Sequence, residues 1–152
     1  MRRHLGVLLI GGIALASAAT APALASVSPG PSAGGSTAHL TGAQEVPAAD
    51  PDGTGQAAVS SFVSSNQVCY ALKVSNVAPA TAAHIHFGVA GTTGPIVVDF
   101  LPPTSGSSAG CASPRPSAPA GVIQNIINHP EQYYVNVHNA AYPGGAIRGQ
   151  LG

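Results

Sequence analysis

The chain has 152 residues, of which 7% are charged and 5% are aromatic, and its formal net charge at pH 7 is zero. Without Arg2 and Arg3, which lie in the N-terminal segment described below, three basic residues face five acidic ones, a formal charge of −2. This balance leaves no basic stripe for nucleic acid and no polybasic surface for anionic lipid, so both classes of partner are disfavoured.

The first 25 residues have the pattern of a secretory signal peptide. Two arginines precede an apolar run over residues 5–15, and the small-x-small sequence Ala23-Leu24-Ala25 supplies a cleavage site. The run is shorter than the roughly 20 residues that span a bilayer, and no later segment is long enough. We therefore expect residues 1–25 to be removed and the mature chain to be secreted, to the extracellular space or the cell envelope, without a membrane span.

The mature chain divides into a short leader and one domain. Residues 26–38 are rich in Ser, Pro and Gly and contain little that can bury a core, so they are predicted to be a flexible leader. Residues 39–152 have the length of one small domain with a single core.

Short apolar stretches separated by turn residues run through this domain. They predict strands at residues 38–40, 55–63, 68–74, 82–87, 96–100, 133–138 and 146–151. Apolar residues at helical spacing over 122–127, ended by His129-Pro130, predict one short helix over an open end or edge of the sheets. Residues 101–116, rich in Pro, Ser and Gly, are expected to form a long surface loop. The fold class that follows is all-β, an antiparallel β-sandwich or Greek-key barrel of about seven to eight strands.

Cys69 and Cys111 are the only cysteines. An even pair in an exported chain most often forms a disulfide, which here would hold the 101–116 loop to the 68–74 strand. The bond would close a loop of about 42 residues, worth roughly 4 kcal/mol on the chain-entropy argument. The alternative, a thiolate ligand or nucleophile, is less favoured because neither cysteine lies in a CxxC motif.

Three histidines are the candidate site. His84 and His86 are two residues apart in a predicted strand, so their side chains share one face while Ile85 points to the other. The 133–138 strand places His138 on its polar face, opposite Val135 and Val137. If the two strands are neighbours, three imidazoles converge and suit Cu(II) or Zn(II). The alternative is a polar patch of hydrogen-bonded histidines without a metal, and the sequence does not show whether the strands are neighbours.

Four further residues are candidates for support of this cluster. Glu45 and Arg148 can orient the imidazoles, with Glu45 accepting a hydrogen bond from a ring or from the Arg148 guanidinium. Alternatively they form a structural salt bridge between the first and last strands, and both interpretations place them close together. Tyr134 and Asn136 share the face of His138, either as a ligand-facing row or as part of a hydrogen-bonded outer sheet face.

Several separated motifs together resemble one known family. They are Leu40-Thr-Gly-Ala-Gln-Glu45-Val-Pro47, Gly53-Thr-Gly55, Ala82-Ala-His-Ile-His86, Gly94-Pro-Ile-Val-Val98, Tyr133-Tyr-Val-Asn-Val-His138 and Tyr142-Pro-Gly-Gly-Ala-Ile-Arg-Gly-Gln-Leu151. In this order they resemble the CHRD domain, the module first described in chordin. The family often has an acidic residue where this chain has Ala146. The resemblance implies an all-β domain of exported bacterial proteins and implies no particular activity.

A local similarity links the His-x-His strand to copper/zinc superoxide dismutases, but no matching zinc-loop residues or further copper histidine accompany it, so dismutase activity is not expected. A hydrolase is disfavoured because no Gly-x-Ser-x-Gly elbow is present. The function predicted from sequence is a secreted interaction module that binds a protein or polysaccharide. The alternative is a copper- or zinc-binding protein with a redox or metal-handling role.

Overall fold

The computed structural model describes residues 32–152; the predicted signal peptide and residues 26–31 of the predicted leader lie outside them. The described residues form eight strands, one α-helix and two 3-10 turns. In chain order the elements are β1 (Ala33–Thr41), η1 (Gly42–Gln44), β2 (Thr54–Phe62), β3 (Gln67–Ser75), β4 (Ala80–Phe87), β5 (Ile96–Phe100), β6 (Ser107–Ala112), α1 (Val122–Asn128), η2 (Pro130–Gln132), β7 (Tyr133–Asn139) and β8 (Ile147–Gln150).

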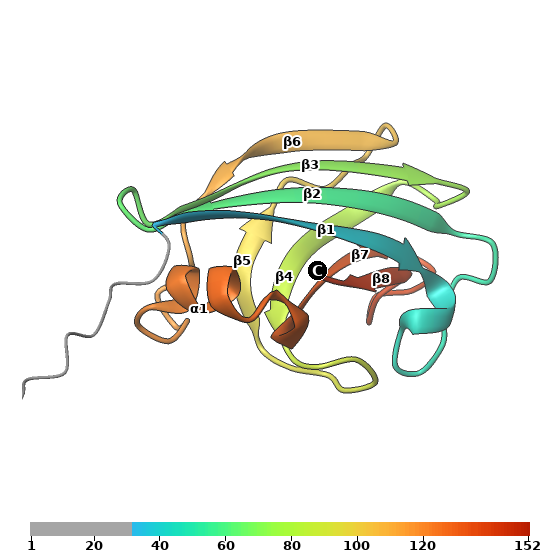
Figure 1. The fold of residues 1–152 in the computed structure, drawn as a ribbon. Helices are drawn as coiled ribbons and strands as arrows, with labels where there is room; N and C mark the ends of the chain where they lie inside the picture. Colours follow the sequence, from blue (N-terminus) through green and yellow to red (C-terminus); the bar gives the residue numbers. More distant parts are fainter. Residues whose placement is uncertain (1–31) are drawn as a thin grey trace, which may run out of the picture.

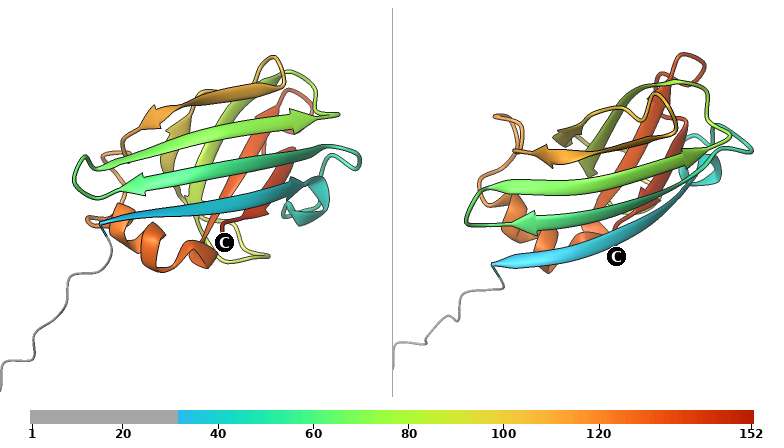
Figure 2. Two further views of the ribbon diagram at one scale, coloured as in Figure 1. Left: turned by 45° about the horizontal axis from the view of Figure 1, so that its top comes forward. Right: turned by 90° about the horizontal axis from the view of Figure 1, so that it is seen from above.

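All eight strands belong to one antiparallel sheet, in the order β5-β4-β7-β8-β1-β2-β3-β6. The sheet curls so that the layer of β1, β2, β3 and β6 lies across the layer of β4, β5, β7 and β8 (Figures 1 and 2). An isolated bridge between Val98 and Pro114 connects β5 to the segment that follows β6. The result is a nearly closed barrel, flattened like a sandwich, and the predicted all-β class is confirmed.

The core lies between the two layers. Buried and more exposed residues alternate along β2 and β3, as expected for strands with one face on the core. α1 covers one end of the barrel and contributes Val122, Ile123 and Ile126 to the core, so the predicted helix is confirmed. Ile85 of β4 and Val135 of β7 are fully buried in this core. Because side chains alternate along a strand, His84, His86 and His138 lie on the outer side of the barrel.

β1 is longer than predicted and begins at Ala33, inside the stretch expected to be leader. Its whole length pairs with β2, from Ala33 opposite Phe62 to Thr41 opposite Thr54. The backbone of β2 therefore stabilises a strand whose composition alone does not favour one. Gly34 has a second role, because a Cβ at this position would lie 2.9 Å from the Ile127 side chain. The glycine lets α1 pack closely against β1.

The predicted 101–116 loop is also partly a strand. β6 pairs with β3 as an edge strand, and Cys69 lies directly opposite Cys111 in this register. The two cysteines form the predicted disulfide, with their Cα atoms 3.9 Å apart. β6 has the sequence Ser-Ser-Ala-Gly-Cys-Ala, which lacks large apolar side chains, so its hydrophobic pattern is too weak to predict a strand.

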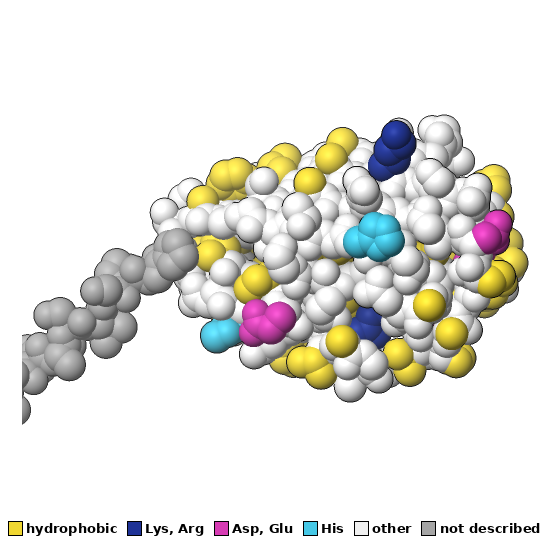
Figure 3. All heavy atoms as spheres, turned by 45° about the vertical axis from the view of Figure 1, so that its right-hand side comes forward, with side chains coloured by type: hydrophobic (Ala, Val, Ile, Leu, Met, Phe, Trp, Pro, Cys, Tyr) yellow, Lys and Arg dark blue, Asp and Glu magenta, His cyan; other side chains and the backbone are white. Residues whose placement is uncertain are grey.

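The surface is sparsely charged. Figure 3 shows a face on which a few charged side chains are separated by uncharged ones. In residues 32–152 no helix combines the length and the apolar character needed to cross a membrane.

Candidate functional site

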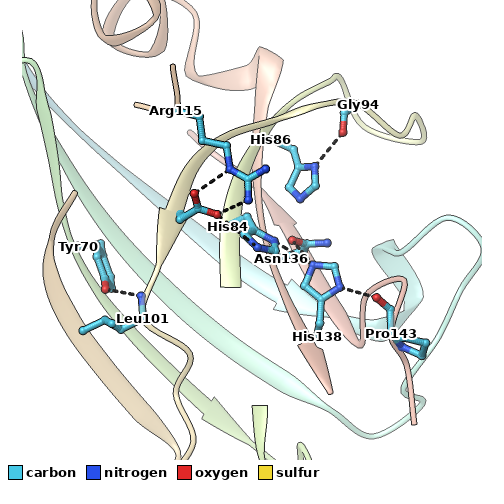
Figure 4. A network of polar contacts seen from close by, with 10 residues as sticks. Tyr70, His84, His86, Gly94, Leu101, Arg115, Asn136, His138 and Pro143 are labelled. Atoms are coloured by element: carbon cyan, nitrogen blue, oxygen red, sulfur yellow. Dashed lines mark hydrogen bonds and ion pairs between the residues drawn. The ribbon is translucent and has the colours of Figure 1, made fainter. Parts of the chain in front are cut away.

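β4 and β7 are adjacent antiparallel strands, and this pairing brings the three histidines together. His84 lies opposite Asn136, and His138 lies opposite Ala82, one step along the same face. One ring nitrogen from each of His84, His86 and His138 lies within 4.8 Å of the others (Figure 4). The closest pair is His84 Nδ1 and His138 Nε2, at 3.1 Å.

The outer nitrogen of each ring faces an acceptor. His86 Nδ1 donates to the carbonyl of Gly94 at 2.8 Å, and His138 Nδ1 donates to that of Pro143 at 3.0 Å. A neutral imidazole carries one N–H, so with the proton on Nδ1 the Nε2 atom of each ring is a lone pair. That of His138 lies 3.1 Å from His84 Nδ1. His86 Nε2 is buried and has no hydrogen-bond partner. The third ring, His84, lies with Nε2 3.7 Å from Asp99 Oδ1.

Burial keeps the three rings neutral. Burial, with a smaller effect from the neighbouring His138 and His86, lowers the pKa of His84 to about 4. Desolvation likewise lowers the pKa of His86 and of His138. Because a proton competes with a metal for the same lone pair, rings that are neutral at pH 7 are ready to act as ligands.

The His86 ring is one member of a stack of three side chains, with Tyr134 and Arg148. The Tyr134 ring lies parallel to the His86 ring, with centroids 4.7 Å apart, and the guanidinium carbon of Arg148 lies 3.4 Å from the Tyr134 centroid. Arg148 is 2% exposed and donates to the carbonyls of Val89 and Thr92. These carbonyls belong to the β4–β5 loop, which also carries Gly94. The stack therefore connects β8 to the loop that orients His86.

Glu45 lies beside the cluster rather than paired with Arg148. Burial raises the pKa of Glu45 to about 7, against the opposing effects of Arg148 and of hydrogen bonds from the Val46 backbone and the Asn136 side chain. The ion pairs among residues 32–152 do not include one between Glu45 and Arg148. A direct salt bridge between the two is therefore not formed, because backbone carbonyls take the Arg148 donors.

The row Tyr134-Asn136-His138 shares one face, as the alternation predicts, but it is not an open outer surface. Tyr134 is 3% exposed and Asn136 is 2% exposed. The Asn136 side chain has its Oδ1 3.0 Å from His138 Nε2. The β4–β5 loop covers this side of the sheet, since the Gly94 N–H donates to the Tyr134 hydroxyl. Period-two alternation identifies the face, but it does not show which loops cover that face.

Asp99 and Arg115 are site residues that sequence reasoning missed. Asp99 lies opposite His84 in the β4–β5 register and accepts from Arg115 Nε at 2.7 Å. The Arg115 hydrogen bond lowers the pKa of Asp99, so this carboxylate is charged near neutral pH. A signal was present, because Asp99 is the only charged residue in the predicted 96–100 strand.

Fold and site together define a small, disulfide-linked, all-β barrel domain with a histidine cluster on its outer side. Residues 36–151 match the CHRD domain family. The chain therefore belongs to the CHRD family, as its motifs indicated. The searches of curated proteins and of solved structures found no match.

Proposed function

We propose that this CHRD domain binds one copper or zinc ion through His84, His86 and His138. The observation that carries the proposal is the convergence of three ligand nitrogens within 4.8 Å, one of them the buried and unpartnered His86 Nε2. A buried polar atom without a partner is costly, and coordination of a cation would remove that cost. Imidazole nitrogens are ligands that both ions bind well.

The surroundings of the rings support the same proposal. Metal-ligating histidines usually donate their second ring N–H to a carbonyl or carboxylate, which holds the tautomer and the ring orientation. Here Gly94 and Pro143 supply such carbonyls, and Asp99 lies near His84 as a carboxylate. A hydrogen-bonded polar patch without metal, the alternative, would be expected to satisfy His86 Nε2 as well.

We also propose that the domain acts outside the cytoplasm, in the extracellular space or the cell envelope. The signal-peptide pattern of residues 1–25 and the Cys69–Cys111 disulfide support this location. Mass spectrometry of the exported protein tests it, with cleavage after Ala25 as the expected result. A retained N-terminus on protein found inside the cell would contradict it.

An interaction role is the second candidate, and a surface hollow supports it. The hollow has a volume of about 720 Å³ on the outer face of β1, β2, β3 and β6. Ala58 and Ala71 line it, with His39, Gln56 and Lys73 as hydrogen-bonding groups. If a polysaccharide or protein binds here, Ala71→Arg should abolish binding to insoluble polysaccharides or to a purified partner. The same binding should survive replacement of the clustered histidines.

The deciding experiment for metal binding compares two double variants. The untagged mature protein is titrated with Cu(II) and Zn(II) and its metal content is measured after dialysis. His84→Ala/His138→Ala removes two candidate ligands, whereas His39→Ala/His129→Ala removes two exposed histidines outside the cluster. We expect one ion per chain in the wild type and in the second variant, and none in the first. Equal metal retention in both variants, with near-ultraviolet circular dichroism showing that both are folded, would refute the proposal.

A further inference from the structure

Asn136 places its side-chain oxygen inside the histidine cluster, against His138 Nε2 and close enough to His86 to affect the pKa of that ring. Asn136 Oδ1 is 3.0 Å from His138 Nε2. A neutral His138 ring carries one proton, yet both of its nitrogens face an acceptor: Nδ1 faces the Pro143 carbonyl at 3.0 Å and Nε2 faces the Asn136 oxygen. With the proton on Nδ1, the Nε2 atom is a lone pair. Two acceptors, His138 Nε2 and Asn136 Oδ1, then face each other at hydrogen-bond distance. Water cannot readily separate them, because Asn136 is only 2% exposed. A cation placed among them would turn this repulsion into coordination.

The orientation of the amide concerns two neighbours, His138 and Glu45. The Asn136 amide also acts on the Glu45 carboxyl group, whose pKa it lowers against the larger effect of burial. In the structure the amide oxygen faces His138 Nε2 at 3.0 Å, which directs the NH₂ group away from that ring and toward Glu45. The flipped amide would donate to His138 but would place its oxygen against the carboxylate. This flipped orientation is the alternative to the one proposed here, and it places no oxygen ligand near the histidines.

The distances are those of ligands around a small ion. His138 Nε2 lies 3.0 Å from Asn136 Oδ1 and 3.1 Å from His84 Nδ1. The ligand atoms of a tetrahedral site with bonds of about 2.0 Å lie about 3.3 Å apart. Two atoms bound to one such ion cannot be more than about 4.2 Å apart. The ligand nitrogens of the three histidines lie within 4.8 Å of one another, so His86 completes the set after a small movement.

We propose that Asn136 Oδ1 is the fourth ligand of the metal site, and that the resulting three-nitrogen, one-oxygen set binds a divalent ion such as Zn(II) or Cu(II) in preference to Cu(I). The inference rests on the proposed metal-binding function. An amide oxygen is a hard ligand, whereas Cu(I) prefers soft sulfur ligands. Four protein ligands also close a tetrahedral shell, which is the arrangement of sites that hold a metal rather than activate water.

Two substitutions separate the ligand role from a packing role. Asn136→Leu keeps the approximate size and removes the oxygen, while Asn136→Asp keeps an oxygen and adds a charge. Zn(II) affinity is measured by chelator competition, Cu(I) affinity under anaerobic conditions, and geometry from the visible absorption of the Co(II)-loaded protein. We expect Asn136→Leu to weaken Zn(II) binding at least tenfold, to change the Co(II) spectrum and to leave Cu(I) affinity within a few-fold. Asn136→Asp should retain or strengthen Zn(II) binding.

A measurement on the wild type makes the test independent of folding in the variants. Zn(II) should shift the side-chain amide resonances of Asn136 strongly in ¹⁵N-edited NMR spectra, more than those of the exposed Asn76. Zn(II) affinity within twofold of wild type in Asn136→Leu, with an unchanged Co(II) spectrum and unshifted Asn136 resonances, would overturn the inference and leave three-histidine binding intact. A wild type that binds neither ion would overturn both proposals.

Discussion

At the residue scale, burial gives the cluster its chemical character. Each of its three histidines has a lowered pKa, and for His84 the value falls from 6.5 to about 4. When folding lowers the pKa of a histidine, the folded state is favoured at pH values above the pKa of the unfolded chain, near 6.5. This stability is lost as the pH falls from that value toward the pKa of the folded state. Glu45 acts in the opposite sense, because folding raises its pKa from 4.5 to about 7. Its contribution to the free energy of unfolding is therefore lost as the pH rises from 4.5 to about 7. Three histidines oppose one carboxyl group.

The metal-free domain should therefore lose stability as pH falls from about 6.5 to 4. For His84 alone the loss is of the order of 3 kcal/mol. The check is urea unfolding at a series of pH values with His84→Gln, which should flatten the dependence, and Glu45→Gln, which should steepen it. His129→Gln, at an exposed position, is the control. Parallel pH profiles for wild type and His84→Gln would show that this ring does not titrate as the structure indicates.

Gly94 is a second residue whose chemistry can be tested. A Cβ there would overlap the backbone carbonyl of Phe87, so alanine must displace the loop and with it the carbonyl that accepts from His86. We expect Gly94→Ala to weaken metal binding roughly tenfold and to cost about 1–3 kcal/mol of stability. Gly144→Ala is the matched control, since nothing lies within 4 Å of its added Cβ. Metal titration and denaturant unfolding measure both effects; equal results for the two variants would contradict the positioning role of Gly94.

At the element scale, adjacency of β4 and β7 builds the cluster, and the connecting loops complete it. The Pro143 carbonyl lies in the loop between β7 and β8, and the Gly94 carbonyl in the loop between β4 and β5. Arg148 of β8 ties the second loop to the barrel through Val89 and Thr92. β6 pairs with β3 at the edge of the sheet and not with β4 or β7, and it reaches the site through the segment that follows it, where Arg115 contacts Asp99.

Removal of the disulfide should therefore weaken the fold without emptying the site. Cys69→Ala/Cys111→Ala opens a loop of 42 residues and should cost up to about 4 kcal/mol, with faster amide hydrogen exchange in β6 than in β4. Metal stoichiometry should stay unchanged in the folded variant. Loss of the metal with an intact β6 would indicate that the site depends on the β3–β6 edge, contrary to the topology.

At the scale of the whole molecule, an ion bound only by the folded state must stabilise it. At a free concentration a hundredfold above the dissociation constant, the gain is about 2.7 kcal/mol. For a domain of this size we expect a rise in Tm of about 10 °C in calorimetry. His39→Ala/His129→Ala should keep the rise and His84→Ala/His138→Ala should lose it. A Tm that is independent of metal concentration in the wild type would contradict specific binding.

Most of the fold could be predicted from the order of the amino acids alone. Short apolar stretches separated by turn residues identified seven of the eight strands, helical spacing identified α1, and the cysteine pair predicted the disulfide. These signals succeed because they are local, or because two cysteines allow only one intramolecular pairing. β6 and the first half of β1 were missed, since both have small, weakly apolar side chains and depend on a neighbouring strand for their hydrogen bonds.

The same division holds for the candidate site. Alternation placed His84 with His86 and placed His138 with Tyr134 and Asn136, but the folded structure was needed to show that β4 pairs with β7 and in which register. It also decided which acceptor orients each ring, that Arg148 contacts loop carbonyls rather than Glu45, and that Asp99 lies beside His84. These contacts join residues far apart in the chain. No local pattern encodes them, because they depend on the path of the loops across the outer side of the barrel.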